Sequence, residues 1–390
     1  MVPNGWKQVD LGSLFDFKNG LNTEKEHYGR GYKFVNVMDV FGNNILTENK
    51  IIGRVQVSDK ELIAYKLHYG DVLFNRTSET FDEIAMAAVY LDDAVATFGG
   101  FVIRGRPKSN DIYPEYSSFL FQAEMYRTQA IKLGQGAVRA NIGQKDLAKV
   151  NVLLPSITEQ KEITQILSTW DQTISATEKL LKNSQQQKKA LMQQLLTGKK
   201  RLRDEKGVEF SDEWQRIELG LLLDYQQPTP YLVESTAYSD SYKTPVLTAG
   251  KTFILGYTNE ISGIYQDQLP VIIFDDFTTD SKYVNFPFKA KSSAMKILTA
   301  KKGVSIKFVF EAMQMLKFNI GGHQRHWISI FSNLVISLPN LKEQQKIAEV
   351  LSLADQEIET LQKKLDCLKQ EKKALMQQLL TGKKRVKVAA

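Results

Sequence analysis

The sequence has a single cysteine, Cys367, and only four histidines. One thiol excludes an internal disulfide and any cysteine-rich metal site. Apolar runs are short as well, because the longest, residues 84–91, falls far below the roughly 20 residues that cross a bilayer. The amino-terminal residues also lack a basic segment followed by an apolar one. We therefore expect a cytoplasmic protein with no membrane segment.

Catalytic motifs are equally scarce. Residues 248–252 end like a phosphate-binding loop, but the leading glycine of that motif would fall on Pro245. His323 and His326 could share one helical face, yet no third metal ligand stands near them. No two prolines are adjacent, so the Asn/Asp-Pro-Pro-aromatic motif of amino-methyltransferases is absent. We found no persuasive nuclease pattern. The sequence therefore predicts binding without chemistry and without a metal.

The net charge of +7 is unevenly distributed. Residues 1–154 are neutral and residues 208–338 carry −1, whereas residues 155–207 and 339–390 carry +4 each. A chain of 390 residues with average hydrophobic content is too long for one ordinary core. The composition therefore predicts at least two domains, and charge alone is weak evidence for nucleic-acid binding.

An internal repeat is the strongest signal in the sequence. The string KKALMQQLLTGKKR occurs at residues 188–201 and again, unchanged, at residues 372–385. The alignment extends back to Pro155 and Pro339 without insertion and gives 26 identities over 49 residues. A weaker echo relates the segments that begin at Trp6 and Trp214. The chain is therefore a tandem of two units, each a variable globular part followed by a near-constant block.

Each near-constant block is predicted to be one long helix. Ser156 and Asn340 begin capping-box patterns, and Gly198 and Gly382 stand where a left-handed helix end belongs. Apolar residues recur at alternating spacings of four and three, as in coiled coils. The second seam is interrupted only by Lys372, whereas the first has polar residues in three seam positions: Thr177, Ser184 and Lys188.

The two helices could pair with each other or with a neighbouring molecule. We favour intramolecular antiparallel pairing, because the chain must follow one helix, build a globular domain and return along the other. The predicted fold class is α+β, with two globular mixed α/β domains and an antiparallel coiled coil in a pseudo-two-fold arrangement. The predicted divisions are residues 1–154, 155–207, 208–338 and 339–390.

The globular segments show short β-like runs between turn signals. The predicted strands are 33–37, 71–74, 85–91, 100–103, 244–247, 270–274 and 304–308, and helices are expected at 114–133 and 308–316. Two of these strands run directly into polar clusters: Asn75, Arg76, Thr77 and Ser78 in the first domain, and Asp276, Thr278 and Thr279 in the second. Arginine, amide and carboxylate side chains read base edges, and hydroxyls bind phosphates. An ordinary polar turn is the competing interpretation.

A second candidate region is the tract 281–310, which has seven lysines and no acidic residue. Such a tract could clamp phosphates, or it could be an ordinary solvated surface. Basic loops also precede both helices at matching places. The further DNA-binding candidates are Lys18, Arg139, Asn141, Lys251, Lys282, Lys289, Lys291, Arg325 and His326.

These motifs resemble one known family. The two Trp-x-x-φ-x-Leu-Gly openings, the Leu-Pro-x-x-x-Glu-Gln helix starts at 154–160 and 338–344, and the two Leu-Met-Gln-Gln-Leu-Leu-Thr-Gly endings are similar to the specificity subunit of type I restriction–modification enzymes. The resemblance covers essentially the whole chain. It implies two target-recognition domains that read the halves of a bipartite DNA target, separated by two helical regions.

The resemblance also implies partners. Two adenine methyltransferase subunits and two translocase–nuclease subunits would assemble with this chain on double-stranded DNA. S-adenosylmethionine, ATP and magnesium would then be bound by those partners and none by this chain. The candidate partner-binding residues are Lys188, Lys189, Gln193, Lys372, Lys373 and Gln377. The rival interpretations are a coiled-coil scaffold that binds proteins and an enzyme with an unrecognised active site.

Overall fold

A computed structural model of the chain describes all residues except 1, 137–138, 249–251, 317–326, 328–329 and 388–390. Its contacts divide the chain into two compact units. Unit 1 comprises Met1–Thr177 together with Lys364–Ala390, and unit 2 comprises Glu178–Lys363. Each unit thus contains one globular domain, the first half of the long helix that follows it, and part of the other long helix.

The globular domain of unit 1 is built on a five-stranded sheet with the order β2-β10-β6-β8-β4. Its strands are β2 (Phe15–Asn19), β4 (Ile45–Leu46), β6 (Val72–Asn75), β8 (Ala87–Tyr90) and β10 (Val102–Pro107). A three-stranded sheet, β5-β3-β9, is formed by β3 (Tyr28–Val35), β5 (Arg54–Val55) and β9 (Ala96–Phe98). Buried apolar side chains fill the space between these sheets and the helices.

Two short ladders complete unit 1. They pair β1 (Lys7–Asp10) with β12 (Asn151–Leu154), and β7 (Thr77–Ser78) with β11 (Ala140–Asn141). The helices of this domain are α1 (Leu11–Leu14), α2 (Val37–Phe41), α3 (Asp59–Tyr65), α4 (Pro114–Leu120), α5 (Glu124–Leu133) and α6 (Gln144–Leu147). Single-turn 3-10 helices lie at Lys25–His27, Glu48–Lys50 and Phe81–Glu83.

Unit 2 repeats this plan with fewer residues. Its main sheet, β14-β20-β17-β18, contains β14 (Leu223–Gln226), β17 (Val271–Asp275), β18 (Ser281–Val284) and β20 (Met295–Ala300). Its smaller sheet contains β15 (Thr244–Leu247), β16 (Ile254–Thr258) and β19 (Lys289–Ala290). The remaining elements are β13 (Gln215–Glu218), which pairs with β21 (Val335–Leu338), α8 (Leu219–Leu222), α9 (Ile306–Met315), and 3-10 turns at Thr229–Tyr231 and Phe331–Asn333.

The two main sheets share their register. In unit 1, β10 lies between β2 and β6 and pairs Ile103 with Phe74. In unit 2, β20 lies between β14 and β17 and pairs Lys296 with Phe274. Phe74 and Phe274 are both fully buried. The two globular segments therefore share a common main sheet as well as the similar segments that begin at Trp6 and Trp214.

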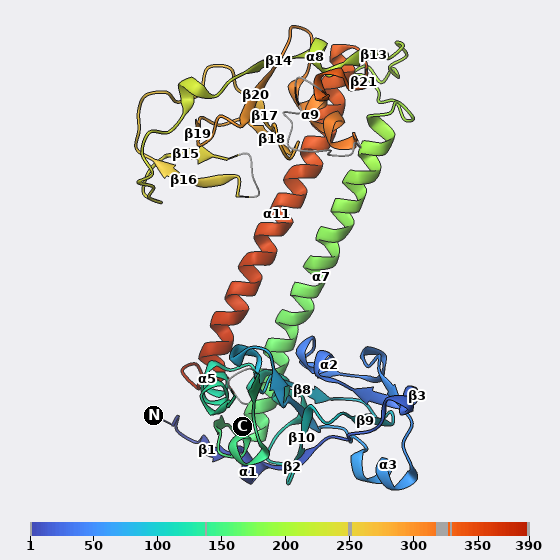
Figure 1. Ribbon diagram of the computed structural model, residues 1–390, viewed down its shortest axis with the longest axis vertical. Helices are drawn as coiled ribbons and strands as arrows, with labels where there is room; N and C mark the ends of the chain where they lie inside the picture. Colours follow the sequence, from blue (N-terminus) through green and yellow to red (C-terminus); the bar gives the residue numbers. More distant parts are fainter. Residues whose placement is uncertain (1, 137–138, 249–251, 317–326, 328–329, 388–390) are drawn as a thin grey trace. The chain divides into compact units, whose positions relative to one another are not determined.

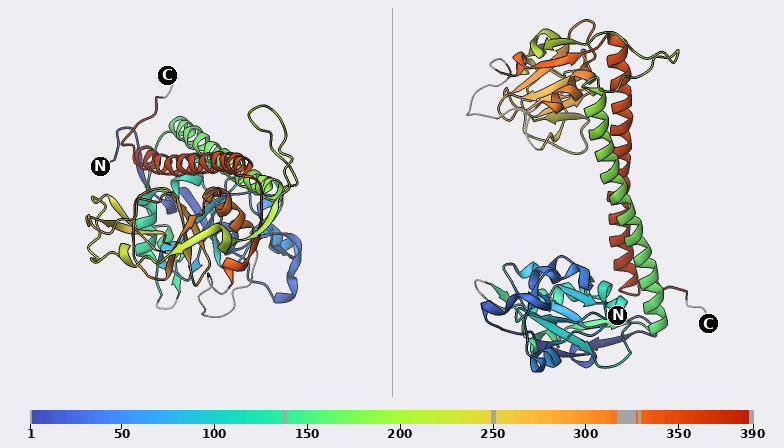
Figure 2. Two further views of the ribbon diagram at one scale, coloured as in Figure 1. Left: turned by 90° about the horizontal axis from the view of Figure 1, so that it is seen from above. Right: turned by 90° about the vertical axis from the view of Figure 1, so that its right-hand side faces the viewer.

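The two near-constant blocks form α7 (Ile157–Leu195) and α11 (Leu341–Leu379), each of 39 residues. Within each unit, segments of the two helices lie side by side and antiparallel (Figures 1 and 2). In unit 2, Ser184 contacts Glu357 and Lys188 contacts Asp355, so the partner number falls as the α7 number rises. In unit 1, Asp171 pairs with Lys372. Intramolecular antiparallel pairing, and with it the predicted fold class, is confirmed.

The helix ends are those that the sequence predicts. The side chains of Ser156 and Asn340 accept hydrogen bonds from the backbone N–H groups of Glu159 and Glu343. Gly198 and Gly382 have φ angles of 69° and 66°, in the left-handed region that favours glycine.

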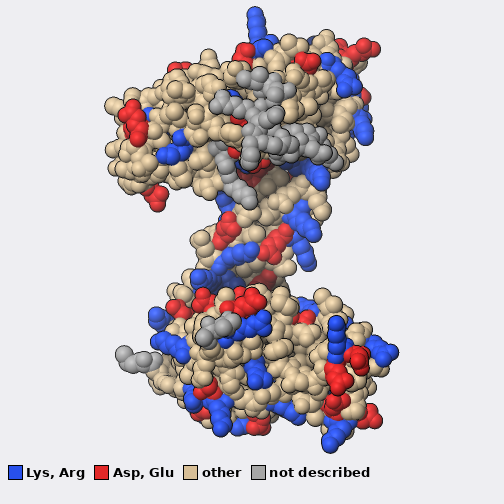
Figure 3. Space-filling view, in the orientation of Figure 1, with Lys and Arg blue, Asp and Glu red and all other residues tan. Residues whose placement is uncertain are grey.

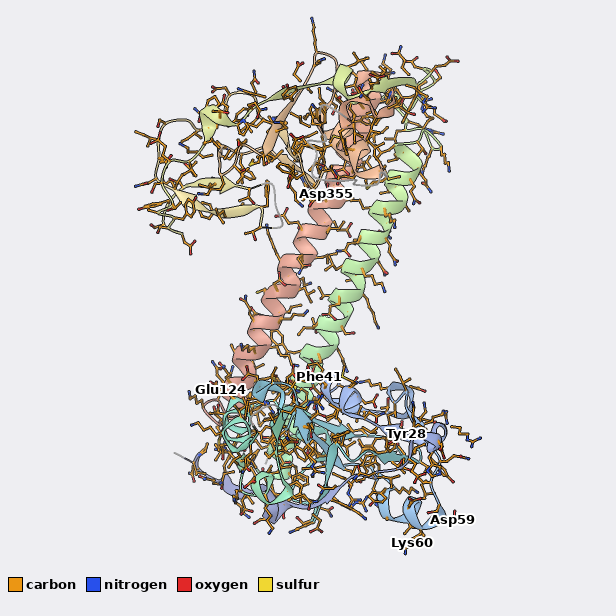
Figure 4. All side chains as sticks on the ribbon, in the orientation of Figure 1. Tyr28, Phe41, Asp59, Lys60, Glu124 and Asp355 are labelled. Carbon is orange, nitrogen blue, oxygen red and sulfur yellow. The ribbon has the colours of Figure 1, made fainter. Side chains whose placement is uncertain are left out.

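The polar residues of the first helix seam are all satisfied by hydrogen bonds or ion pairs, and the Thr177 hydroxyl donates to the carbonyl of Thr173 in the same helix. Ser184 is buried, and Lys188 lies between the carboxylates of Asp355 and Glu311, all within unit 2. Figure 4 labels Asp355 on α11. Glu311 is fully buried and also pairs with Lys307. Ser184 and Lys188 of α7 therefore face carboxylates of α11 and α9.

Two predictions about the globular domains were wrong in detail. The run 304–308 was expected to be a strand, but α9 begins at Ile306. The Ser305 side chain caps this helix by accepting a hydrogen bond from the backbone N–H of Phe308. The single helix expected at 114–133 is two helices, α4 and α5, with a break at residues 121–123. Among the described residues, no helix is long and apolar enough to span a membrane.

Candidate DNA interface and its anchor on the helices

In unit 1 a buried carboxylate joins the globular domain to both helices. Glu159, in the first turn of α7, is 3% exposed and accepts a hydrogen bond of 3.0 Å from the indole Nε1 of Trp6. The same carboxylate binds Arg385, whose Nε and Nη2 donate over 2.6 and 2.8 Å. The Arg385 guanidinium also lies over the Trp6 ring and donates to the backbone carbonyl of Asn4.

Unit 2 contains the same anchor with equivalent residues. Trp214 Nε1 donates to Glu343 over 3.1 Å, and Arg201 binds the same carboxylate through Nε and Nη2, each over 2.7 Å. Arg201 also lies over the Trp214 ring and donates to the carbonyl of Asp212. The hydrogen bonds that Arg201 donates to Glu343 raise the pKa of Arg201. The sequence repeat is therefore also a repeat of contacts.

A glutamine adjacent to each carboxylate adds a second link. Gln160 accepts from the backbone N–H of Tyr113 and donates to the carbonyl of Asp111. Gln344 accepts from the backbone N–H of Ser305. Both glutamines are fully buried, so these bonds form where competing water is excluded. Each globular domain is thus fixed to the start of its own helix.

The structure brings together two of the predicted DNA-reading segments of the first domain. Thr77 and Asn141 are paired in the ladder of β7 and β11, although 64 residues separate them. The Thr77 hydroxyl donates to Asn141 Oδ1 over 2.8 Å, and the Asn141 amide donates to the carbonyl of Arg139. Arg76 accepts a backbone hydrogen bond from Ile142. The polar end of β6 and the loop before α6 therefore form one surface.

This surface opens into a hollow of about 480 Å³. The lining residues come from α2, β6 and β7, from the turn and 3-10 helix after β7, and from the positions just before β10 and β11: Val37, Met38, Phe41, Asn75, Thr77, Ser78, Glu79, Glu83, Phe101 and Arg139. Arg139 is exposed, and Ser78 donates to Glu83 over 2.8 Å. The hollow combines a guanidinium, hydroxyls, carboxylates and apolar groups, and side chains with these groups recognise the edges of DNA bases.

Asn75 and Arg76 are less accessible than expected. Asn75 is 1% exposed, and its Oδ1 accepts no hydrogen bond from the described residues. Arg76 is half-buried, and its Nη1 donates to the carbonyl of Gly100 over 3.3 Å. Their role in DNA contact stays a prediction, and both also hold the strand end in place.

Lys18 occupies a structural position in unit 1. Its Nζ donates to the carbonyl of Ala64 at the end of α3 and lies 4.6 Å from the centre of the Tyr65 ring. Burial, followed by the charges of Arg104 and Arg106, lowers the pKa of Lys18. A DNA contact by Lys18 stays untested.

Asp276 was proposed to accept a hydrogen bond from a base, and this prediction is corrected. Asp276 is 1% exposed and accepts from the backbone N–H of Trp327 over 2.9 Å. It also pairs with the equally buried Lys296. A carboxylate enclosed in this way cannot reach a base edge. Thr278 is exposed and Thr279 half-buried on the same turn, so these two stay candidates.

The basic tract 281–310 is not one continuous surface. Lys289 is 2% exposed and its Nζ binds Glu260 and the carbonyl of Ser262, so its assignment to DNA was wrong. Lys296 is buried with Asp276, and Lys307 pairs with Glu311 and Asp355. Lys282 is exposed, and Lys291 is half-buried with its Nζ 5.9 Å from the centre of the Tyr238 ring.

Three further candidates, Lys251, Arg325 and His326, lie outside the described residues. Over the face of unit 1 seen in Figure 3, basic and acidic side chains are intermingled. Residues 1–154 have no net charge, and on that face their basic and acidic side chains also lie close to one another. Phosphate attraction by a single large basic patch is not supported there.

The predicted partner-binding residues on the helices divide into two groups. Lys188 and Lys372 turn inward and form ion pairs with Asp355 and Asp171 in their respective units. The other four are exposed: Lys189, Gln193, Lys373 and Gln377. Of these, Lys373 and Gln377 line a hollow between α11 and α5 of unit 1, and Gln377 donates to Glu124. A role of these four residues in meeting another subunit stays a prediction.

Several residues of the anchor and of the hollow are not predicted from the sequence. The sequence similarities contained Trp6, Glu159 and Arg385 and their equivalents, so the recurrence of these three residue types in both units could have revealed the anchor. Met38, Phe41 and Phe101 around the hollow had no comparable signal. An apolar residue in a short loop looks the same in the sequence whether it is buried or exposed.

The comparisons with known proteins agree with this architecture. Residues 3–184 and 211–370 match the family described as the type I restriction modification DNA specificity domain. The chain belongs to this family. It is accordingly a DNA-recognition subunit of a type I restriction–modification system and not itself an enzyme.

Individual relatives cover different parts of the chain. The EcoR124I/EcoR124II specificity subunit of Escherichia coli is 53% identical over 138 residues, which is 34% of this chain and 33% of that subunit. The putative MjaX specificity subunit of Methanocaldococcus jannaschii is 25% identical over 417 aligned residues, covering 99% of this chain and 95% of that protein.

Solved structures show the same fold. The type I system S subunit from M. genitalium aligns with a TM-score of 0.65 and 16% identity over 97% of this chain and 98% of that one. The HsdS subunit from Thermoanaerobacter tengcongensis aligns with a TM-score of 0.50 and 17% identity over 98% of each chain.

Proposed function

We propose that this chain reads a bipartite DNA target, with one half-site recognised by each globular domain. The single observation that carries the proposal is the duplicated anchor. Trp6, Glu159 and Arg385 in unit 1 correspond to Trp214, Glu343 and Arg201 in unit 2. Identical fixation of two globular domains to the same pair of helices suits two recognition events of the same kind.

The two domains would read different sequences. Both main sheets place a strand end at the same register position, where Asn75 faces Val102 and Asp275 faces Met295. The residues that follow these strand ends differ, since Arg76 is half-buried and Asp276 is enclosed. A common scaffold with unlike polar groups at the strand end supports two unlike half-sites.

The helices would set the spacing between the half-sites. α7 links the two domains along the chain, and α11 returns beside it in each unit. A helix of 39 residues is about 58 Å long at 1.5 Å per residue. Helices are stiff over this length, so the number of turns would fix how many base pairs stay unread.

The exposed face of the helices would dock the catalytic partners. Lys189, Gln193, Lys373 and Gln377 are exposed at equivalent places of the repeated string. The relatives are specificity subunits of restriction enzymes, which supports assembly with two adenine methyltransferase subunits and two translocase–nuclease subunits. S-adenosylmethionine, ATP and magnesium would be bound by those partners, and this chain would bind none of them.

The proposal is tested by expressing the chain together with its methyltransferase subunit and mapping methylated adenines in the DNA of the cells. We expect a target of two specified blocks separated by a constant number of unspecified bases. A target that is one uninterrupted block would contradict the proposal, as would an unchanged methylation pattern. Methyl transfer by the purified chain alone would contradict the assignment of chemistry to partners.

A further inference from the structure

Three large apolar side chains surround the hollow of the first domain without contributing to the core. Met38 is 73% exposed, Phe41 is 43% exposed and Phe101 is 64% exposed. They come from α2 and from the turn between β9 and β10. Figure 4 labels Phe41 at α2. A group of exposed apolar side chains at a concave surface marks a binding site.

The local structure holds these side chains outward. In α2, Val40 is 1% exposed and packs into the core, so the same short helix turns Met38 and Phe41 to the other side. The backbone carbonyl of Phe101 accepts from the backbone N–H of Arg76 over 2.9 Å, and this bond fixes the turn. The exposure therefore follows from a defined backbone, and the three side chains are placed before any ligand arrives.

The neighbours of these apolar groups are suited to base edges. Thr77, Ser78 and Arg139 line the same hollow. In duplex DNA, the groups that base edges offer in the major groove are hydrogen-bond donors, acceptors and one apolar group, the 5-methyl of thymine. An apolar rim beside polar readers is therefore complementary to a thymine and to the pairs next to it.

We propose that Met38 and Phe101 read the 5-methyl group of a thymine in the half-site recognised by the first domain, with Phe41 completing the apolar surface. This inference rests on the proposed function, because it assumes that the first domain reads one half-site. It adds the chemical group that is read and the residues that read it. Polar contacts by Arg139 and Thr77 would fix the neighbouring positions.

The test measures binding of the chain, assembled with its methyltransferase subunit, to duplexes that carry the mapped target. Each thymine of the first half-site is replaced in turn by deoxyuridine, which lacks only the methyl group. Burial of one methyl group corresponds to about a fourfold change in affinity. We expect one thymine at which this replacement weakens binding by about fourfold.

The same replacements are then measured with Met38→Ala and Phe101→Ala. Both variants should bind the thymine duplex more weakly than the native chain, and at least one should bind the thymine and deoxyuridine duplexes equally. Because both residues are mostly exposed, their replacement leaves the core intact. Ile63→Ala on α3, at an 84% exposed residue outside the hollow, should keep the full fourfold preference.

The inference is overturned if no deoxyuridine replacement in the first half-site weakens binding by the native chain, or if both variants keep the preference for thymine. Weaker binding by Phe101→Ala with no sensitivity to the methyl group would instead indicate a side chain wedged between base steps. Deoxyuridine replacements in the second half-site distinguish a failure of this inference from a failure of the proposed function. If Phe101→Ala changes the thymine preference there, the division into one half-site per domain fails as well.

Discussion

Arg385 and Glu159 are 226 residues apart in the sequence, yet the guanidinium of one holds the carboxylate of the other through two hydrogen bonds. The pair brings the segment that follows α11 to the start of α7 and against Trp6. Arg201 and Glu343 do the same in unit 2. The segment after α11 therefore anchors the first globular domain, and the segment after α7 anchors the second in the same way.

The anchor in unit 2 can be tested by Glu343→Gln. The Glu343 carboxylate is fully buried and accepts from Trp214 and Arg201, so its loss leaves two donors poorly matched. We expect the free energy of unfolding of unit 2 to fall by about 2 kcal/mol, measured by urea unfolding. Glu359→Gln removes an exposed partner of Lys363 and should change it by less than about 0.5 kcal/mol. Equal effects of the two replacements would contradict the anchor.

The seam cluster predicts a defined dependence on pH. Burial would raise the pKa of Asp355, but hydrogen bonds and charge from Lys188 and Lys307 outweigh it, so the pKa lies below 3.8. A lowered carboxyl pKa stabilises the folded state above the unfolded pKa, and the contribution is lost as the pH falls through the folded pKa. The urea midpoint difference between the native chain and Asp355→Asn should stay constant from pH of about 8 to about 5 and shrink below 3.8. A difference that grows in acid would be inconsistent with this pairing.

Two adjacent lysines on α7 should behave differently. Lys188→Met leaves the buried Glu311 with Lys307 alone, and we expect a loss of about 2 kcal/mol of stability in urea unfolding. Lys189→Met changes an exposed residue, so stability should be unchanged while affinity for the methyltransferase subunit falls in a pull-down titration. If Lys189→Met leaves assembly unaffected, this helix face is not the docking surface.

Replacing two lysines of the basic tract 281–310 should have different effects, one on stability and one on DNA binding. Lys289→Met breaks a buried ion pair with Glu260 and should lower the urea midpoint without altering the methylated sequence. Lys282→Ala changes an exposed residue and should weaken DNA binding by the assembled complex about equally for all sequences. The slope of log Kd against log salt should fall by about 1 if Lys282 contacts a phosphate. An unchanged slope would remove Lys282 from the interface.

The sequence predicts the helices better than the domains that they carry. Ser156 and Gly198 mark the two ends of a long segment in which apolar residues recur with a helical period. The position of a residue within that period determines whether it faces inward. Thr244–Leu247 is likewise a strand as predicted, since turns flank a short β-branched run. The boundaries drawn at 154, 207 and 338 follow the repeat and stay predictions.

The candidate site was harder to predict, because it depends on which side chains are buried. Lys282 and Lys289 look alike in the sequence, but only Lys289 meets a carboxylate, which is 29 residues away. Asp276 was read as a free acceptor because nothing in the sequence relates it to Trp327. The pairing of Thr77 with Asn141 is a long-range ladder, and local patterns do not encode such contacts.

If the helices set the length of the spacer between the half-sites, paired insertions into α7 and α11 should lengthen that spacer. One heptad is inserted after Ser184 in α7 and one after Glu357 in α11, two residues that contact each other, so that the seam keeps its register. Seven residues add about 10 Å, or about three base pairs. Mapping of methylated adenines should then show both half-sites unchanged and the spacer longer by about three base pairs. Altered half-sites with an unchanged spacer would contradict the account.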